Sequence, residues 1–174
     1  MSPNKTKALE IASSEGQSDA LRAMFESYPD SNANYWAVVD FNQSSSVERL
    51  FIFDLGSGSV KKFLVAHGHN SGEAFATKFS NVIGSNCSSL GIYKTLGTYN
   101  GKHGESLKIE GLDETNSNAE VRDVVIHSAD YVVPNYSGTG RAGRSEGCFA
   151  VNPNDIEEVI EDLKNGSYLN AWHS

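Results

Sequence analysis

The sequence is poor in cysteine and proline and has no excess of positive charge. Its two cysteines, Cys87 and Cys148, allow one bridge at most, which excludes a disulfide framework as the source of stability. Lysine and arginine number 14 against 22 aspartates and glutamates, so the formal net charge is -8. Nucleic acids and anionic membrane surfaces attract basic proteins, and we therefore expect neither as a partner.

Long apolar runs are also missing. No stretch approaches the roughly 18 residues that a membrane-spanning helix needs, so no membrane span is expected. The N-terminus, Met1 to Glu15, is polar and lacks the apolar segment of a secretory signal peptide. Three explanations stay open: a cytoplasmic protein, export by an unusual route, or a leader that has been removed.

The apolar pattern predicts helices at the two ends of the chain. Residues 1–34 are expected to form a helical lead-in packed on the domain, and residues 35–174 the domain itself. In the C-terminal helix we expect Asn152 as the N-cap with Pro153 at the first helical position, followed by an apolar stripe that reaches Leu163.

Strand signals occupy the middle of the chain. Residues 50–55 and 60–66 are rich in β-branched and aromatic residues and flank a glycine-serine turn, which predicts a hairpin. A further strand is expected over residues 121–126. Segment 68–104 is dense in glycine, serine and asparagine, so we expect it to be looped apart from a short strand at 91–93.

Cys148 is the first candidate for a chemical role. It follows Gly147 in a loop of small residues shortly before a helix. Glycine before a nucleophile lets the backbone turn sharply, so that neighbouring N–H groups can point at a developing oxyanion. The competing interpretation is a buried structural cysteine, the commonest fate of a lone cysteine.

His127 is the candidate base for that thiol. It lies at the end of a predicted strand, and an imidazole within hydrogen-bond reach would convert the thiol of Cys148 to a thiolate–imidazolium pair. The other ring nitrogen needs a partner, for which the carbonyl or side chain of Ser128 is close in sequence. A core histidine bonded to a carbonyl is the alternative.

Three more histidines, His67, His69 and His103, lie in two glycine-rich segments. A metal site is one interpretation, but no nearby carboxylate or cysteine spacing matches a known site, and no metal is expected. We expect instead that these segments line a substrate cleft.

Cationic side chains near the same segments suggest the chemistry of a substrate. Lys102, Arg141 and Arg144 could contact substrate carboxylates in an otherwise acidic protein. For each of the three, a solvated surface charge is the alternative.

The fragments from about Tyr35 to about Gly166 resemble the murein L,D-transpeptidase catalytic-domain family, in its divergent second YkuD-like branch. The matching pieces, in chain order, are Asp40-Phe41, Arg49 to Leu55, Val65 to Gly68, Asn70 to Gly72, Phe79 to Asn81, Ser88 to Gly91, Thr98 to Gly104, Ser106-Leu107, Gly111-Leu112, Val125 to His127, Ala129 to Val132, Gly143 to Ser145 and Gly147-Cys148.

This resemblance implies a mixed α/β, β-rich fold, a YkuD-like β-sandwich or open barrel with flanking helices. It implies that Cys148 is the nucleophile, that His127 is the base oriented by Ser128, and that the N–H groups of Gly147 and Cys148 hold the oxyanion. Substrate contacts are expected from residues of the matching loops, namely His67, Tyr99, Lys102, His103, Arg144 and Ser145.

The implied activity is acyl transfer on the stem peptides of peptidoglycan. An L,D-peptide bond of a tetrapeptide is cleaved through a cysteine thioester, which an amine resolves into a 3→3 crosslink and water hydrolyses, as in an L,D-carboxypeptidase or endopeptidase. No cofactor is implied. The site of action is periplasmic or otherwise extracytoplasmic, reached without a signal peptide, and a secreted antibacterial effector would add an immunity protein or a secretion partner.

Three positions depart from the branch pattern. Ser128 stands where glycine is usual, Glu146 where tryptophan is usual, and Phe149 where proline is usual. A carboxylate at Glu146 would raise the pKa of the thiol unless it is paired. The departures suggest an altered specificity or a hydrolytic rather than crosslinking outcome. Two further alternatives stay open, a catalytically dead wall-binding module, which Glu146 favours, and a cysteine protease or amidase that acts on an ordinary protein.

Overall fold

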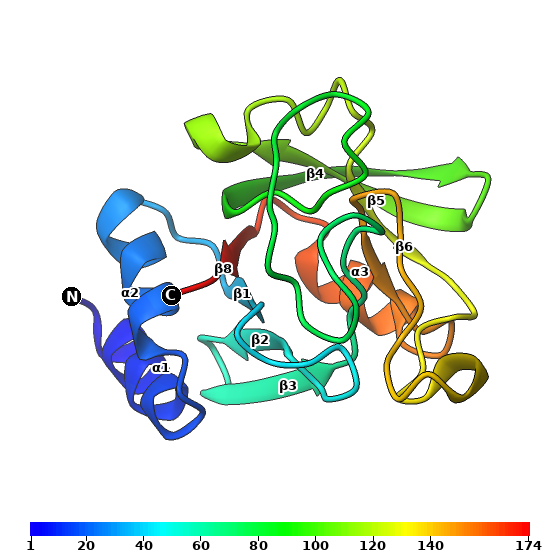
Figure 1. The fold of residues 1–174 in the computed structure, drawn as a ribbon. Helices are drawn as coiled ribbons and strands as arrows, with labels where there is room; N and C mark the ends of the chain where they lie inside the picture. Colours follow the sequence, from blue (N-terminus) through cyan, green and yellow to red (C-terminus); the bar gives the residue numbers. More distant parts are fainter.

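The computed structural model describes residues 1–174 and has eight strands and three α-helices (Figure 1). The elements, in chain order, are α1 (Pro3–Ser14), α2 (Ser18–Ser27), β1 (Tyr35–Asp40), β2 (Leu50–Asp54), β3 (Ser59–Phe63), β4 (Gly91–Gly101), β5 (Gly104–Gly111), the 3₁₀ turn η1 (Glu114–Asn116), β6 (Val125–Ser128), the 3₁₀ turn η2 (Tyr136–Gly138), β7 (Phe149–Val151), α3 (Ile156–Leu163) and β8 (Tyr168–Trp172).

The strands form one curled sheet in the order β3-β2-β1-β8-β4-β5-β6-β7. Only the β1–β8 and β6–β7 pairs are parallel, and all the others are antiparallel. Helices α1 and α2 lie at one end of the molecule and the β4–β5 hairpin at the other (Figure 1). The expected β-rich mixed fold with flanking helices is confirmed.

Strand β1 lies in the sheet with apolar packing on both of its faces. Trp36 and Val38 join the core cluster that contains α1 and α2, whereas Ala37 and Val39 join the cluster that contains α3. Successive side chains of a strand point to opposite faces, so this alternation places a helical layer on each side of β1. The apolar run of β1 reflects burial on both faces.

The hairpin predicted from residues 50–66 is confirmed by the antiparallel pairing of β2 with β3. The prediction for segment 68–104 is wrong in its second half, where β4 continues from Gly91 to Gly101 and pairs with both β5 and β8. Glycine and asparagine at Asn100-Gly101 belong to the end of a strand and the tight turn that follows it. The second half of β4 was missed because its exposed residues, Gly97, Thr98, Asn100 and Gly101, are of types that favour turns or carry no apolar pattern.

Two boundaries differ from the sequence prediction. Helix α3 begins at Ile156, after a turn over residues 153–155. The Asn152 side chain accepts from the N–H of Asn154 at 2.8 Å, which is the bond expected of an N-cap, and donates to the carbonyl of Val132 at 2.9 Å.

The strand expected over residues 121–126 is β6, which starts only at Val125. Asp123 before it has a left-handed backbone with φ 55°, which ends the preceding turns and places the strand four residues later than predicted. No helix in the structure combines the length and the apolar character that crossing a membrane would need.

Candidate active site

Strands β6 and β7 bring the two candidate catalytic residues to one face of the sheet. They pair in parallel, with Ile126 opposite Phe149, and both of these side chains belong to the main core cluster. Residues one position away point to the other face. His127 and Cys148 therefore both face away from the core.

A cavity of about 990 Å³ opens on that face. The residues that line it are His69, Asn86, Tyr99, Gly101, Lys102, His103, Ser106, Arg122, Asp123, Val125, His127, Tyr131, Arg144, Ser145, Glu146 and Cys148. Most of these residues are polar. Among them are both members of the expected thiol–imidazole pair, so the cavity is the candidate active site.

The ring of His127 is fixed in one tautomer. Its Nδ1 lies 2.9 Å from the carbonyl oxygen of Ser128, and because a carbonyl can only accept, Nδ1 must carry a hydrogen. In the neutral ring this leaves the lone pair on Nε2, which makes no hydrogen bond within the protein. The ring of His103 stacks on the ring of His127, with centroids 4.1 Å apart and planes 12° apart. His127 is thus held as a base whose free nitrogen is Nε2.

Burial sets the charge state of the pair. It lowers the pKa of His127 below its ordinary value, and the nearby His103 and Lys102 lower it further, although the bond to Ser128 opposes them. Burial likewise raises the pKa of the Cys148 thiol. Both shifts favour the neutral forms. The hydrogen bonds of the Cys148 thiol go to Asp123 and Val125 and none joins it to His127, so the structure gives no support to a thiolate–imidazolium pair in the free protein.

A turn before β6 cradles the sulfur. The thiol of Cys148 donates to the carbonyl of Asp123 at 3.3 Å, and the N–H of Val125 donates to Sγ at 3.4 Å. The first bond stabilises the thiol, whereas the second stabilises the thiolate and lowers its pKa. Ionisation therefore requires the S–H bond to turn away from Asp123 while the bond from Val125 stays in place.

Arg122 is a site residue that the sequence reasoning missed. Its guanidinium donates to Ser80 at 3.0 Å, to Ser85 at 3.2 Å and to the carbonyl of Cys87 at 2.7 Å. It also lies against Gly147, whose Cβ, if one were added, would meet Nη2 at 3.0 Å. Arg122 therefore fastens the loop before β4 beside Gly147, and its charge lowers the pKa of the Cys148 thiol. A single arginine before a strand carries no sequence signal for this role.

The two N–H groups expected at the oxyanion site differ. The N–H of Gly147 donates to Ser145 Oγ at 3.2 Å, and that hydroxyl in turn donates to the Cys148 carbonyl at 2.7 Å. The N–H of Cys148 makes no hydrogen bond within the protein. Gly147 has φ 120°, a left-handed conformation that favours glycine, and this sharp bend shapes the loop before Cys148.

His67 lies away from the cavity, unlike the other expected substrate contacts. It is 1% exposed, its Nδ1 accepts from Arg49 at 2.9 Å, and its Nε2 donates to the carbonyl of Gly72 at 3.2 Å. Burial and the neighbouring Arg49 lower the pKa of His67 to about 4, so the ring is neutral. The structure gives His67 a place in the core network rather than a surface that substrate could touch.

The remaining predicted contacts line the cavity. Tyr99, Lys102 and His103 come from the end of β4 and the hairpin turn, while Arg144 and Ser145 come from the loop before Cys148. The buried hydroxyl of Ser145 bonds its own loop, so its observed contacts are structural.

Glu146 and Tyr131 line the cavity together with Cys148. Glu146 forms no ion pair, and its charge raises the pKa of the Cys148 thiol, as its position in the sequence suggested, although burial is the larger cause. Burial also raises the pKa of Tyr131 to about 12, so this phenol stays protonated. No group of three or more His, Cys, Asp or Glu side chains is placed to hold a metal ion.

Comparison with known proteins gives a consistent family. A sequence model of the L,D-transpeptidase catalytic domain matches residues 8–172. The fold is similar to an L,D-transpeptidase from Mycobacterium smegmatis, with a TM-score of 0.50 and 15% identity, covering 81% of this chain and 59% of that one. It is also similar to an L,D-transpeptidase solved in complex with imipenem, with a TM-score of 0.50 and 12% identity, covering 80% of this chain and 59% of that one.

A third solved structure, an L,D-transpeptidase from Stackebrandtia nassauensis, has a TM-score of 0.48 and 13% identity over 91% of this chain and 66% of that one. The chain thus spans about three fifths of the length of the first two solved chains. Among the curated proteins compared, none matches. Because the family match covers nearly the whole sequence, this chain belongs to the L,D-transpeptidase catalytic-domain family.

Proposed function

We propose that the protein is a cysteine peptidyltransferase that cleaves an L,D-peptide bond in the stem tetrapeptide of peptidoglycan through a thioester on Cys148. The observation that carries this proposal is the fixed tautomer of His127, whose Nδ1–H is held by Ser128 while Nε2 stays free in the cavity that Cys148 shares. Membership of the family supplies the substrate class.

General-base catalysis follows from the neutral pair. As Sγ of Cys148 attacks the carbonyl carbon, Nε2 of His127 takes the thiol proton, so that no free thiolate has to build up in a buried site. The tetrahedral intermediate collapses, the C–N bond breaks, and His127 returns the proton to the leaving amine, which departs as D-alanine. An acceptor amine then attacks the thioester, giving its proton to His127, which passes it to the departing sulfur.

The N–H of Cys148 is the donor we assign to the oxyanion, because it has no partner in the free protein. The N–H of Gly147 can join it only by leaving the hydroxyl of Ser145, from which it is 3.2 Å away. Each well-placed donor to an oxyanion contributes on the order of 10²–10³ to the rate. Water in place of the acceptor amine makes the same site an L,D-carboxypeptidase or endopeptidase.

Mass spectrometry of purified muropeptides tests the reaction. We expect the wild-type protein to release D-alanine and to form crosslinked dimers or trimmed stems, and Cys148→Ala to form neither. His127→Gln, which keeps a hydrogen-bonding side chain but no base, should lower the rate by about 10²–10⁴. The product shows whether amine or water is the acceptor.

Two competing functions have distinct outcomes in the same assay. A wall-binding module without activity would retain murein without releasing D-alanine, and a protease or amidase would cleave a protein substrate while leaving muropeptides intact. Either result would remove the proposed function.

We also propose an extracytoplasmic site of action, since that is where peptidoglycan lies. Delivery as an antibacterial effector is one form of this proposal. It predicts that the chain harms the producing cell when it carries an added signal peptide and not otherwise. Equal growth in both cases, with active protein present, argues against the effector.

A further inference from the structure

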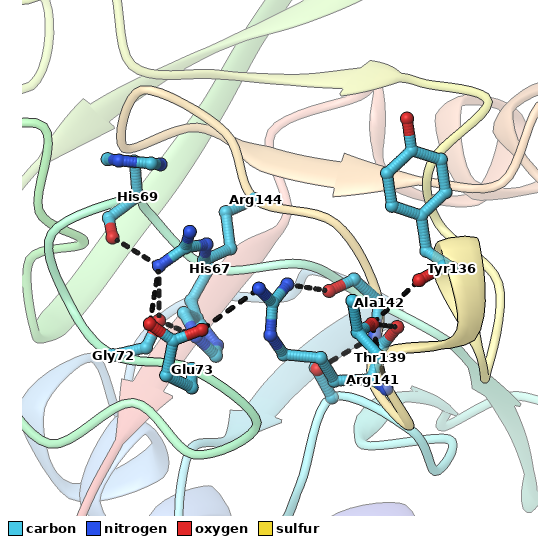
Figure 2. A network of polar contacts seen from close by, with 10 residues as sticks. His67, His69, Gly72, Glu73, Tyr136, Thr139, Arg141, Ala142 and Arg144 are labelled. Carbon is cyan, nitrogen blue, oxygen red and sulfur yellow. Dashed lines mark hydrogen bonds and ion pairs between the residues drawn. The ribbon is translucent and has the colours of Figure 1, made fainter.

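Two arginines, Arg141 and Arg144, meet one glutamate, Glu73, as Figure 2 shows. One carboxylate oxygen of Glu73 lies 2.9 Å from Arg141 Nη2, and the other lies 3.3 Å from Arg144 Nη1. Glu73 comes from the loop between β3 and β4, and both arginines come from the loop that leads to Cys148. Arg144 also lines the cavity that holds Cys148.

The guanidinium groups are held by contacts that do not involve Glu73. Arg144 Nη1 donates to the carbonyls of His69 at 3.0 Å and Gly72 at 3.3 Å, and Arg141 Nη1 donates to the next carbonyl along the chain at 2.9 Å. The side chains of the arginines are 18% and 14% exposed. A planar guanidinium fixed in this way is prepared to bind a carboxylate, because little rotamer freedom is left to lose.

Glu73, in contrast, is loosely held. Its side chain is 73% exposed, and its carboxylate makes no hydrogen bond or ion pair beyond those with the two arginines. Ion pairs at such exposure contribute little, since water competes for both partners and a flexible side chain loses entropy. One carboxylate also neutralises only one of the two positive charges.

We propose that Arg141 and Arg144 form a carboxylate-binding subsite beside the nucleophile, which Glu73 occupies in the free protein and a substrate carboxylate takes over. The identity of the ligand, a stem peptide, rests on the proposed function. In a protein with a net charge of -8, an anionic substrate is repelled by the overall field, and a cationic pair at the cavity rim gives it one place to dock. Glu73 acts as an internal competitor for a carboxylate ligand. A neutral, amidated peptide has no carboxylate to place on the arginines, so its affinity should not depend on Glu73.

Calorimetric binding to an inactive background, Cys148→Ala, tests the subsite. The two probes are the stem tetrapeptide with free carboxylates and the same peptide with its carboxylates amidated. Adding Glu73→Gln should tighten binding of the free acid by about threefold, because the competitor is removed, and leave the amide unchanged. Adding Arg144→Gln should weaken binding of the free acid by about tenfold and leave the amide unchanged.

Glu161→Gln is the matched control. Glu161 lies on α3, its side chain is 71% exposed, and it pairs with Lys164 at 2.9 Å, so the substitution removes the same charge at similar exposure far along the chain. It should not change the ratio of the two affinities. If Glu73→Gln weakens both peptides equally, Glu73 only braces the loop and the proposal is wrong. Failure of every variant to bind the free acid overturns it as well.

The outcome separates the subsite from the reaction. If the wild-type protein forms no product from muropeptides while the affinity ratio moves as expected, the subsite stands and the proposed function falls. If product forms while the ratio does not respond to Glu73→Gln, the subsite alone is refuted.

Discussion

The two ends of the sheet are held together by different interactions. Around β1 and β8 both faces are covered by apolar side chains, and the helices α1, α2 and α3 supply most of the cover. Around β6 and β7 one face packs on the core, while the other carries the polar cavity. The loops over that cavity are fastened by two partly buried arginines, Arg122 and Arg144, that donate to backbone carbonyls.

This difference separates the source of stability from the source of reactivity. Apolar burial is insensitive to orientation and scales with area, so the helical end can hold the fold without fixing any polar atom. Hydrogen bonds are directional, so the loops at the cavity end fix atoms such as Nε2 of His127 and Sγ of Cys148. Substitutions at the two ends should therefore change different measured quantities.

The largest effect is expected from Trp36→Ala at the helical end. Trp36 is fully buried, stacks on Tyr168 with ring centroids 4.7 Å apart, meets the edge of Phe25 at 4.9 Å and donates to Ala33 at 2.8 Å. Removing a buried aromatic ring costs about 3–5 kcal/mol in the free energy of unfolding, which urea denaturation measures.

If stability and reactivity are separate, folded Trp36→Ala should keep the wild-type reactivity of Cys148. In urea concentrations below the unfolding midpoint of the variant, its rate of Cys148 alkylation should depend on pH as the wild-type rate does. A shifted thiol pKa in folded Trp36→Ala would show that packing at the helical end governs the site, and the separation would fail.

The sequence predicted the helical end better than the cavity end, because apolar burial leaves a pattern in the residue types and directional hydrogen bonds do not. Apolar periodicity marks strands such as 50–54 and the stripe of α3, because burial by area leaves a pattern in the residue types. The family resemblance pointed to the pair Cys148 and His127. The contacts of Arg122 and of Glu73 with the arginines join segments far apart in the chain, and no local pattern encodes them.

The charge state of the site also depends on features that the sequence does not show. An imidazole within reach of a thiol predicts a thiolate–imidazolium pair, whereas burial raises the pKa of Cys148 and lowers that of His127, which favours the neutral forms. Burial depends on how loops close over a site, and the residue types alone do not give it.

A smaller effect, at the cavity end, is expected from Arg122→Lys. Lysine keeps the charge but cannot reach the three acceptors on Ser80, Ser85 and Cys87 together. We expect kcat/KM on muropeptides to fall by about tenfold, since small misplacements of reacting groups are costly, with little change in the thiol pKa. Arg122→Gln, which also loses the charge, should lower kcat/KM further and raise the pKa of Cys148.

Arg22→Gln provides the control for this comparison. Arg22 is exposed on α2, so its loss should affect neither quantity. If Arg122→Lys retains full activity, the arginine acts by charge alone and the directional role given to it is wrong.

The smallest effect is expected from Glu146→Gln, and it tests the electrostatics of the cavity most directly. Glu146 raises the pKa of the Cys148 thiol, so its neutralisation should lower that pKa and increase the alkylation rate at pH 7 by about threefold. Because the wild-type pKa is already raised, the wild-type rate should keep climbing with pH beyond the range where an ordinary thiol levels off. Asp123→Asn should act in the same direction but more weakly, and added salt should reduce both effects. Unchanged alkylation in Glu146→Gln at low salt would mean that solvent screens this carboxylate completely and that burial alone sets the reactivity of the nucleophile.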